Sequence, residues 1–290
     1  MKIKSYKSDE VEPCREASKI TATILDELNN IIKEDVSTSE IDDYCLTRIQ
    51  ELGGTPAPLF YRGFPKSTCT SLNHVICHGI PNHNRNLQNG DILNVDVTTI
   101  IDGWHGDSSR MFKVGDISIK ASNLCKVTHD CLIESIGEIK VGEPINKIGK
   151  KIENIATSNN FSVVRDFCGH GVGLKFHENP SILHYYDSEY DKVKFVDGMI
   201  FTIEPMINVG KYQSKILNDG WTAVTKDKTL SAQYEHTIYI NGDIIEILTE
   251  SPSKAFYNWY QDTLEKFLKK SGKIVINFKY GLTLKFSLVR

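Results

Sequence analysis

Residues 91–115 read DILNVDVTTIIDGWHGDSSRMFKVG, and this stretch decides how the chain folds. Its alternation of apolar and polar residues predicts two strands, Ile92–Ile101 and Trp104–Val114. Asp102-Gly103 lies between them, and Asp-Gly flanked by two such runs is a strong signal for a two-residue hairpin turn. The stretch therefore predicts an antiparallel pair of strands.

The register of this hairpin brings two acidic side chains to one face. Thr98 lies opposite Asp107, and Asp96 precedes Thr98 by two residues, so Asp96 and Asp107 are diagonal neighbours. Such neighbours lie roughly 7–8 Å apart, close enough to bind one cation or a close pair of cations. The alternative is that both acids lie on a solvent-exposed face of the sheet without a cation. The rest of the chain helps to decide between these two alternatives.

Length and composition set the broad class. A chain of 290 residues can bury a large core, in one domain or two. The net charge of −3 gives no reason to expect DNA or a membrane as a partner. The charge is uneven, because residues 252–290 carry +6 and the remainder −9. We expect a helix over 254–270 and one or two strands over 273–289, in a basic extension that holds no catalytic residue.

The chain has the features of a cytoplasmic protein. The N-terminus, MKIKSYKSDE, lacks the apolar run of a signal peptide, and no stretch reaches the ~20 apolar residues of a membrane span. Seven cysteines without a CxxC pair argue against a disulfide framework and a structural zinc site.

Helical periodicity appears in three regions. Apolar spacing predicts an amphipathic helix over residues 8–33. A second helix begins at Ser37, which forms a capping box with Glu40. Residues 120–160 predict two further helices, separated by the Gly-Glu-Pro of residues 142–144.

Two further strand-like runs each contain one glutamate. Glu204 lies in Met199–Val209 and Glu235 lies in Ala232–Ile240. A charge inside a buried strand is unfavourable unless it is paired or bound to a metal. Pro205 cannot donate to a strand ladder, so we expect the first run to end or break there.

A repeated spacing indicates two related halves. Gly90 precedes Asp96 by six residues, and Gly198 precedes Glu204 by six. Two strands that deliver a carboxylate at the same offset suggest an internal duplication, although chance can also supply such a match.

Three histidines stand in glycine-rich or strand-end contexts. Glycine on both sides of His170 permits close backbone approach, which favours a ligand over a core histidine. His177 follows seven residues later, and His78 ends a strand-like run over residues 75–77. A lone histidine at a strand end is usually structural. Residues 55–81 predict loop and short strands with exposed Phe60, Tyr61 and Phe64.

Together these residues predict a metal centre. The set comprises four carboxylates and one imidazole: Asp96, Asp107, His170, Glu204 and Glu235. Four carboxylates cannot gather in a low-dielectric cleft without a counter-charge. Two divalent cations would supply it, at the ~3.5–4 Å separation of two-metal sites, and would activate a water for hydrolysis. His78 and His177 then remain to hold the substrate and the tetrahedral intermediate.

The motifs resemble a known family. CHGIP (77–81), NVDVTTIIDGWHGDSSRMF (94–112), GHGVGLKFHENP (169–180), FTIEPMI (201–207) and QYEHTI (233–238) are similar to type I methionine aminopeptidases of bacterial or organellar kind, in the peptidase M24 family. The resemblance covers about residues 5–250. It implies the α/β pita-bread fold, in which two pseudo-symmetric halves form one curved antiparallel sheet with helices outside. Residues 1–250 would be the catalytic domain and 251–290 an extension.

The resemblance also implies roles for the metal ligands. Asp96 would chelate one metal, and Asp107 and Glu235 would bridge both. His170 and Glu204 would hold the second, with Glu204 also the general base. The ions would be two divalent cations per subunit, drawn from Co²⁺, Mn²⁺, Fe²⁺, Zn²⁺ and Ni²⁺, since O/N ligand sets accept several first-row ions.

The substrate-binding positions follow in the same way. His78 would contact the substrate amide or leaving group, and His177 the scissile carbonyl or its oxyanion. The methionine pocket would be lined by Tyr61, Phe64, Cys69, Phe176 and Trp221. An apolar pocket with a sulfur neighbour suits a flexible thioether. The sequence departs from the family at Arg62, where many bacterial members have histidine, and at Leu174, where arginine is common.

The function implied is removal of initiator methionine from nascent chains when the second residue is small and uncharged. We expect a monomer that acts on N-termini in the cytoplasm, and a ribosome contact of the basic extension is a hypothesis. Two alternatives stay open. An Xaa-Pro aminopeptidase or prolidase shares the ligand set but usually has an extra N-terminal domain, and a non-catalytic binding relative generally loses ligands.

Overall fold

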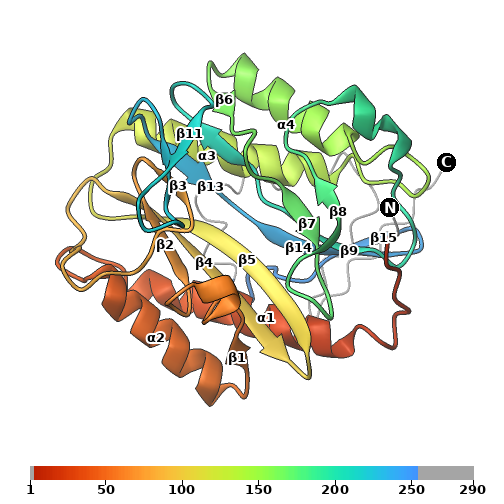
Figure 1. Ribbon diagram of the computed structural model, residues 1–290, viewed down its shortest axis with the longest axis horizontal. Coiled ribbons are helices and arrows are strands. Elements are labelled where there is room, and N and C mark those ends of the chain that lie inside the picture. The colour runs from red at the N-terminus through yellow and green to blue at the C-terminus, as the bar shows by residue number, and fades with distance from the viewer. Residues whose placement is uncertain (1–2, 254–290) are drawn as a thin grey trace.

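The predicted hairpin runs through the middle of the molecule (Figure 1). The computed structural model describes residues 3–253. Strand β4 (Ile92–Ile101) pairs with β5 (Trp104–Lys113) in the predicted antiparallel register, with Ile101 opposite Trp104 and Thr98 opposite Asp107. Asp102 and Gly103 form the turn with left-handed φ angles of 48° and 81°, which this residue pair tolerates well. The prediction for this stretch is confirmed.

The remaining elements surround this hairpin. The helices are α1 (Glu12–Glu27), α2 (Thr38–Glu51), α3 (Ile119–Ile136) and α4 (Lys147–Ser158), with 3-10 turns η1 (Leu28–Asn30), η2 (Tyr61–Gly63) and η3 (Ser188–Lys192). The other strands are β1 (Thr55–Pro56), β2 (Cys69–Leu72), β3 (Val75–Cys77), β6 (Ser162–Val163), β7 (Gly169–Gly171), β8 (Glu178–Ile182), β9 (Ile200–Ile203), β10 (Met206–Asn208), β11 (Ser214–Ile216), β12 (Ala223–Thr225), β13 (Ser231–Gln233), β14 (His236–Asn241) and β15 (Ile244–Ile247).

The described strands form two halves, each with a helical cover. In the first half, β1-β4-β2 with β5 packs against α1 and α2, over a core that includes Ile24, Leu25 and Val95. In the second half, β15-β14-β9-β7-β8 and β13-β10-β6 pack against α3 and α4. The strand pairings are antiparallel. The turn glycines Gly90 and Gly198, which define the repeated spacing, both have left-handed φ angles, of 94° and 81°.

The two halves meet along β5. The backbone N–H of Glu235 donates to Ser109 O at 3.0 Å, and the Ser108 hydroxyl donates to Glu235 O at 2.7 Å. The Thr237 hydroxyl donates to Asp107 O at 2.7 Å. These buried hydrogen bonds join strands from both halves beside two of the predicted metal ligands, so the position of each carboxylate depends on both halves.

The helices form where periodicity predicts them. Ser37 caps α2, and the capping box with Glu40 is present. The first helix is shorter than predicted, because α1 ends at Glu27 and a 3-10 turn follows. The Asn29 side chain there donates to Asp26 O at 3.0 Å, which satisfies a terminal carbonyl and competes with a further helical turn.

Two other expectations need correction. The run Ala232–Ile240 is interrupted at Tyr234-Glu235, because the N–H of Glu235 is used by β5 rather than by a neighbour in its own sheet. The sequence predicts an exposed Phe64, but its exposed fraction is only 3%. It packs edge-on against Trp221, with ring centroids 5.2 Å apart. The predicted break at Pro205 is confirmed, since β9 ends at Ile203 and β10 begins at Met206.

Some expectations concern residues beyond the described range. The helix predicted over 254–270 and the strands over 273–289 lie outside residues 3–253. Within residues 3–253, no helix has the length and apolarity that crossing a membrane requires. The seven cysteines are free thiols, as their spacing predicts.

Candidate metal centre and active site

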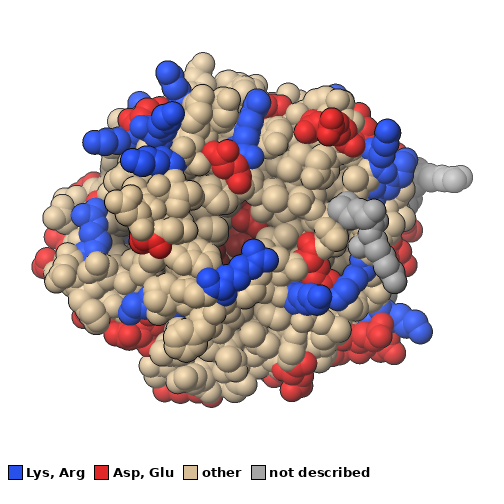
Figure 2. Space-filling model, viewed as in Figure 1, with Lys and Arg blue, Asp and Glu red and all other residues tan. Residues whose placement is uncertain are grey.

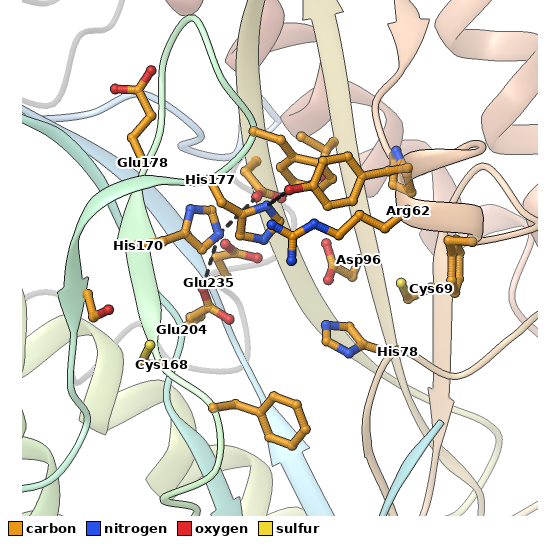
Figure 3. A pocket seen from close by; sticks show the side chains of 18 of the residues that line it. Arg62, Cys69, His78, Asp96, Cys168, His170, His177, Glu178, Glu204 and Glu235 are labelled. Atoms are coloured by element: carbon orange, nitrogen blue, oxygen red, sulfur yellow. Dashed lines mark hydrogen bonds and ion pairs between the residues drawn. The ribbon is translucent and has the colours of Figure 1, made fainter. Parts of the chain in front are cut away.

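One cleft contains the candidate site. Its volume is about 660 Å³, and residues from both halves line it (Figure 3). The predicted site residues that line it are Tyr61, Phe64, Cys69, His78, Asp96, Asp107, His170, Phe176, His177, Glu204, Trp221 and Glu235. The structure thus brings together every residue that the sequence nominated, from segments far apart in the chain.

The five predicted metal ligands converge at the bottom of the cleft. Asp96 lies on β4, Asp107 on β5 and His170 on β7, while Glu204 follows β9 and Glu235 precedes β14. His170 Nε2 lies 3.7 Å from Asp107 Oδ2 and 3.5 Å from Glu204 Oε1. One ligand atom from each of Asp107, His170 and Glu235 falls within 4.8 Å of the others. These are spacings at which side chains can share a cation.

The orientation of His170 fits a metal ligand. Its Nδ1 lies 3.0 Å from Gly171 O, and because a carbonyl only accepts, Nδ1 carries the ring proton. Burial lowers the pKa of His170 to about 4, so the ring is neutral at pH 7. The lone pair of Nε2 then faces the carboxyl groups of Asp107 and Glu204, so one cation could bind the imidazole and both acids.

The carboxylates need a counter-charge. Burial and mutual repulsion raise the pKa of Asp96, Glu204 and Glu235 well above the usual range, and burial raises the pKa of Asp107 to about 7. Desolvation and like charges both disfavour the ionised form. Divalent cations would supply the missing charge, and the O/N donor set suits first-row divalent ions. The residues present therefore fit a metal centre.

Several polar side chains that sequence reasoning did not nominate orient these ligands. Thr98 Oγ1 donates to Asp107 Oδ1 at 2.7 Å, and Gln233 Nε2 donates to Glu204 Oε2 at 3.2 Å. The backbone N–H of Glu204 donates to His184 Nε2 at 3.2 Å. The register that places Thr98 opposite Asp107 could have revealed the first contact. The other two depend on tertiary packing.

Aromatic rings form the walls above the cluster. Tyr61 packs against Phe176 with centroids 4.9 Å apart and stacks on His177 at 5.3 Å. Tyr61 OH lies 3.0 Å from His177 Nδ1. Phe64 and Trp221 form a second aromatic pair. These rings give the cleft an apolar wall beside the carboxylates.

His78 lies on the opposite side of the cleft from His177 (Figure 3). Its backbone has a left-handed φ of 56°, uncommon outside glycine, and burial lowers the pKa of its ring. The ring meets Phe167 edge-on at 5.5 Å. Phe167, Cys168 and Met206 also line the cleft, and sequence reasoning missed all three. Their apolar or small side chains carry no signal that separates a cleft wall from a core.

Comparison with known proteins decides the family. The sequence pattern of Metallopeptidase family M24 matches residues 12–242. The chain belongs to this family. It is 47% identical over 261 residues to the methionine aminopeptidase of Rickettsia prowazekii, a match that covers 90% of this chain and all of that protein.

Solved structures agree with this assignment. The crystal structure of methionine aminopeptidase from Rickettsia prowazekii has a TM-score of 0.83 and 46% identity, over 86% of this chain and 100% of that one. A prolidase from Pyrococcus furiosus has a TM-score of 0.67 at 19% identity, over 85% of this chain and 65% of that one, and so shows the fold alone. The predicted α/β pita-bread fold is confirmed, and membership of a metallopeptidase family supports the use of a divalent metal.

Proposed function

We propose that this protein is a metal-dependent methionine aminopeptidase, which removes initiator methionine from nascent chains when the second residue is small and uncharged. The observation that carries this proposal is the convergence of four carboxylates, three of them buried, and the unprotonated Nε2 of His170 beneath an aromatic pocket. The relatives described above carry the name of this activity.

Five side chains would hold two divalent cations. Asp96 would bind one ion, His170 and Glu204 the other, and Asp107 and Glu235 both. When bound, the ions lower the pKa of a water and polarise the scissile carbonyl. Glu204 would accept the proton of the attacking water, and Thr202 Oγ1, which donates to Glu204 Oε1 at 2.8 Å, would orient its carboxylate.

The two cleft histidines would handle the peptide itself. When the Tyr61 hydroxyl donates to His177 Nδ1, the ring proton is on Nε2, which can then donate to a carbonyl oxygen or its oxyanion. His78 is neutral at pH 7 because burial lowers its pKa, so it can exchange a hydrogen bond with the substrate amide. Tyr61, Phe64, Cys69, Phe176 and Trp221 would enclose the methionine side chain.

The test is the release of the N-terminal residue from Met-Ala-Ser and from Ala-Pro-Ala. Metal-stripped protein would receive Co²⁺, Mn²⁺ or Fe²⁺, with Glu204→Gln as the control. We expect metal-dependent cleavage of Met-Ala-Ser alone, lost in the variant. Cleavage of Ala-Pro-Ala instead would indicate the Xaa-Pro alternative. Metal binding without cleavage of either peptide would indicate a non-catalytic relative.

The setting of the reaction is also part of the proposal. We place the catalytic unit in residues 1–250 and expect a cytoplasmic monomer that meets nascent N-termini. The +6 charge of residues 252–290 suits contact with ribosomal RNA. Deletion of 254–290 would then reduce co-sedimentation with ribosomes at low salt, and unchanged co-sedimentation across a salt series would refute the contact.

A further inference from the structure

Two basic side chains at the mouth of the cleft have no acidic partner. Figure 2 shows acidic side chains deep in the central hollow and basic side chains along its edge. Arg62 and Lys175 both line the cleft and are exposed. Within residues 3–253, neither forms an ion pair with a carboxylate. Lys4, a third cation there, is paired with Glu178 at 2.8 Å.

Both side chains belong to loops that are fixed beside the cleft. Arg62 has a left-handed backbone (φ 48°, ψ 28°), and its guanidinium lies 5.3 Å from the centroid of the Tyr61 ring. The backbone N–H of Lys175 donates to Glu178 Oε1 at 3.0 Å. Because Tyr61 also contacts His177, the two loops meet above the carboxylates. Figure 3 shows the Arg62 side chain extending toward the cluster.

The remaining charges of the cleft do not cancel these cations. Glu178 is neutralised by Lys4, and its carboxylate also accepts from Tyr6 OH at 3.2 Å. Asp166 accepts from the hydroxyl of Ser214 at 2.6 Å and lies beside Phe167, on the side of the cleft that holds His78. Two divalent ions would balance the four carboxylates below. The mouth beside Tyr61 therefore has a net positive charge.

We propose that Arg62 and Lys175 select substrates with an acidic side chain at the third or fourth residue. This inference rests on the proposed function. If the methionine fills the aromatic pocket and the scissile bond lies above the metal ligands, the following residues must leave through the mouth. An extended chain advances roughly 3.3 Å per residue, so the third and fourth residues reach the level of the two cations. Coulomb attraction there favours carboxylates and disfavours lysine.

The test compares kcat/KM for Met-Ala-Asp-Ser and Met-Ala-Lys-Ser, with Met-Ala-Ser-Asp and Met-Ala-Ser-Lys for the fourth position. Exposed charge pairs contribute about 0.2–1 kcal/mol each, so two cations predict an Asp:Lys ratio of roughly 2- to 30-fold at low ionic strength. The ratio should approach one at about 0.5 M salt, where the Debye length is only a few Å. The double variant Arg62→Gln/Lys175→Gln should lose the preference.

Lys19→Gln is the matched control, since it removes one exposed positive charge from α1, outside the cleft. The Lys19→Gln protein should keep the wild-type Asp:Lys ratio of kcat/KM. A ratio of one in wild-type protein at low salt, or a ratio retained by the double variant, would overturn the inference. Cleavage of neutral Met-Ala-Ser-Ser separates the two claims. If Met-Ala-Ser-Ser is cleaved but the charged peptides show no Asp:Lys preference, only this inference fails. If no peptide is cleaved, this inference and the proposed function both fail.

Discussion

His170 Nε2 lies 3.5 Å from Glu204 Oε1, and one hydroxyl holds both residues in place. Thr202 Oγ1 accepts from the backbone N–H of His170 at 3.0 Å and donates to Glu204 Oε1 at 2.8 Å. Thr202 lies on β9, two residues before Glu204, and β9 pairs with β7, which carries His170. The Thr202 side chain therefore helps to set the distance between an imidazole and a carboxylate of the proposed metal centre, and Gln233 holds the second oxygen of the same carboxylate.

Replacement of Thr202 by valine should lower kcat by roughly tenfold, with a smaller change in KM for Met-Ala-Ser. Valine has a similar shape but leaves the buried N–H of His170 unpaired, at a cost of about 1–3 kcal/mol, and frees the Glu204 carboxylate. Steady-state kinetics of the metal-loaded enzyme would measure this. Thr225→Val is the control, because the Thr225 hydroxyl donates to Thr229 O at 2.7 Å and Thr225 does not line the cleft. An unchanged kcat in Thr202→Val would contradict the positioning role.

Replacement of Asp107 by asparagine should alter the pH dependence of stability in metal-free protein. Asp107 has a pKa of about 7 when folded, against 3.8 as an ordinary value, so the folded state holds a proton that the unfolded state releases. The stability from this group is complete below about pH 4 and is lost as pH rises through about 7. Asparagine does not titrate, so the variant does not lose stability in this way as the pH rises.

The free energy of unfolding of Asp107→Asn, minus that of wild type, should therefore rise between about pH 4 and pH 7. Asp107 itself contributes a slope of at most about 1.4 kcal/mol per pH unit. Its charge also raises the pKa of Asp96, Glu204 and Glu235, so its removal adds to the rise. Urea titrations of both metal-free proteins would measure it. The buried histidines titrate with the opposite sign, but both proteins contain them, so their effect cancels in the difference. A constant difference across this range would refute the raised pKa.

Replacement of Trp221 by alanine should reduce kcat/KM for Met-Ala-Ser by about 10- to 100-fold, because the Phe64–Trp221 pair forms one wall of the proposed methionine pocket. Phe60→Ala is the matched control, since Phe60 is 78% exposed and does not line the cleft. Equal losses of kcat/KM in the two variants would show that Trp221 has no specific role in binding methionine.

Replacement of Asp26 by asparagine should destabilise the fold by about 3–5 kcal/mol in urea unfolding. Asp26 forms an ion pair with Arg110 of β5 and accepts from Ser251 Oγ at 2.7 Å and from Ser253 N at 2.8 Å. Burial raises the pKa of Asp26, but the charge of Arg110 and these hydrogen bonds outweigh it, so the pKa lies below the usual value.

Asp43→Asn provides the comparison for this variant, since Asp43 is exposed on α2. It should change the free energy of unfolding by less than about 0.5 kcal/mol. If both variants unfold at the same urea concentration as wild type, the Asp26 network does not stabilise the fold.

Local chemistry explains which features the sequence could predict. The hairpin followed from Asp102-Gly103, because two left-handed residues in succession are rare outside such a turn. The capping box of Ser37 and Glu40 and the break at Pro205 are similarly local. Glu204 and Glu235 were recognisable because a charged residue inside an apolar strand requires a partner. Asp96 and Asp107 followed from the hairpin register, and His170 from the glycines on both sides of it.

Features that depend on distant residues were missed. Phe64 is buried only because Trp221, from another loop, packs against it. The strand around Glu235 is interrupted because its N–H bonds to Ser109 in the other half. Gln233 and His184 contact Glu204 across the fold, and these contacts depend on tertiary packing that the local sequence does not reveal.

The central claim is that Asp96, Asp107, His170, Glu204 and Glu235 form a metal centre. An anomalous difference map, recorded at the cobalt absorption edge from a crystal grown with Co²⁺, tests it most directly. We predict two peaks enclosed by these five side chains, with Asp107 and Glu235 in contact with both. A well-ordered crystal with no anomalous peak among these residues would contradict the account.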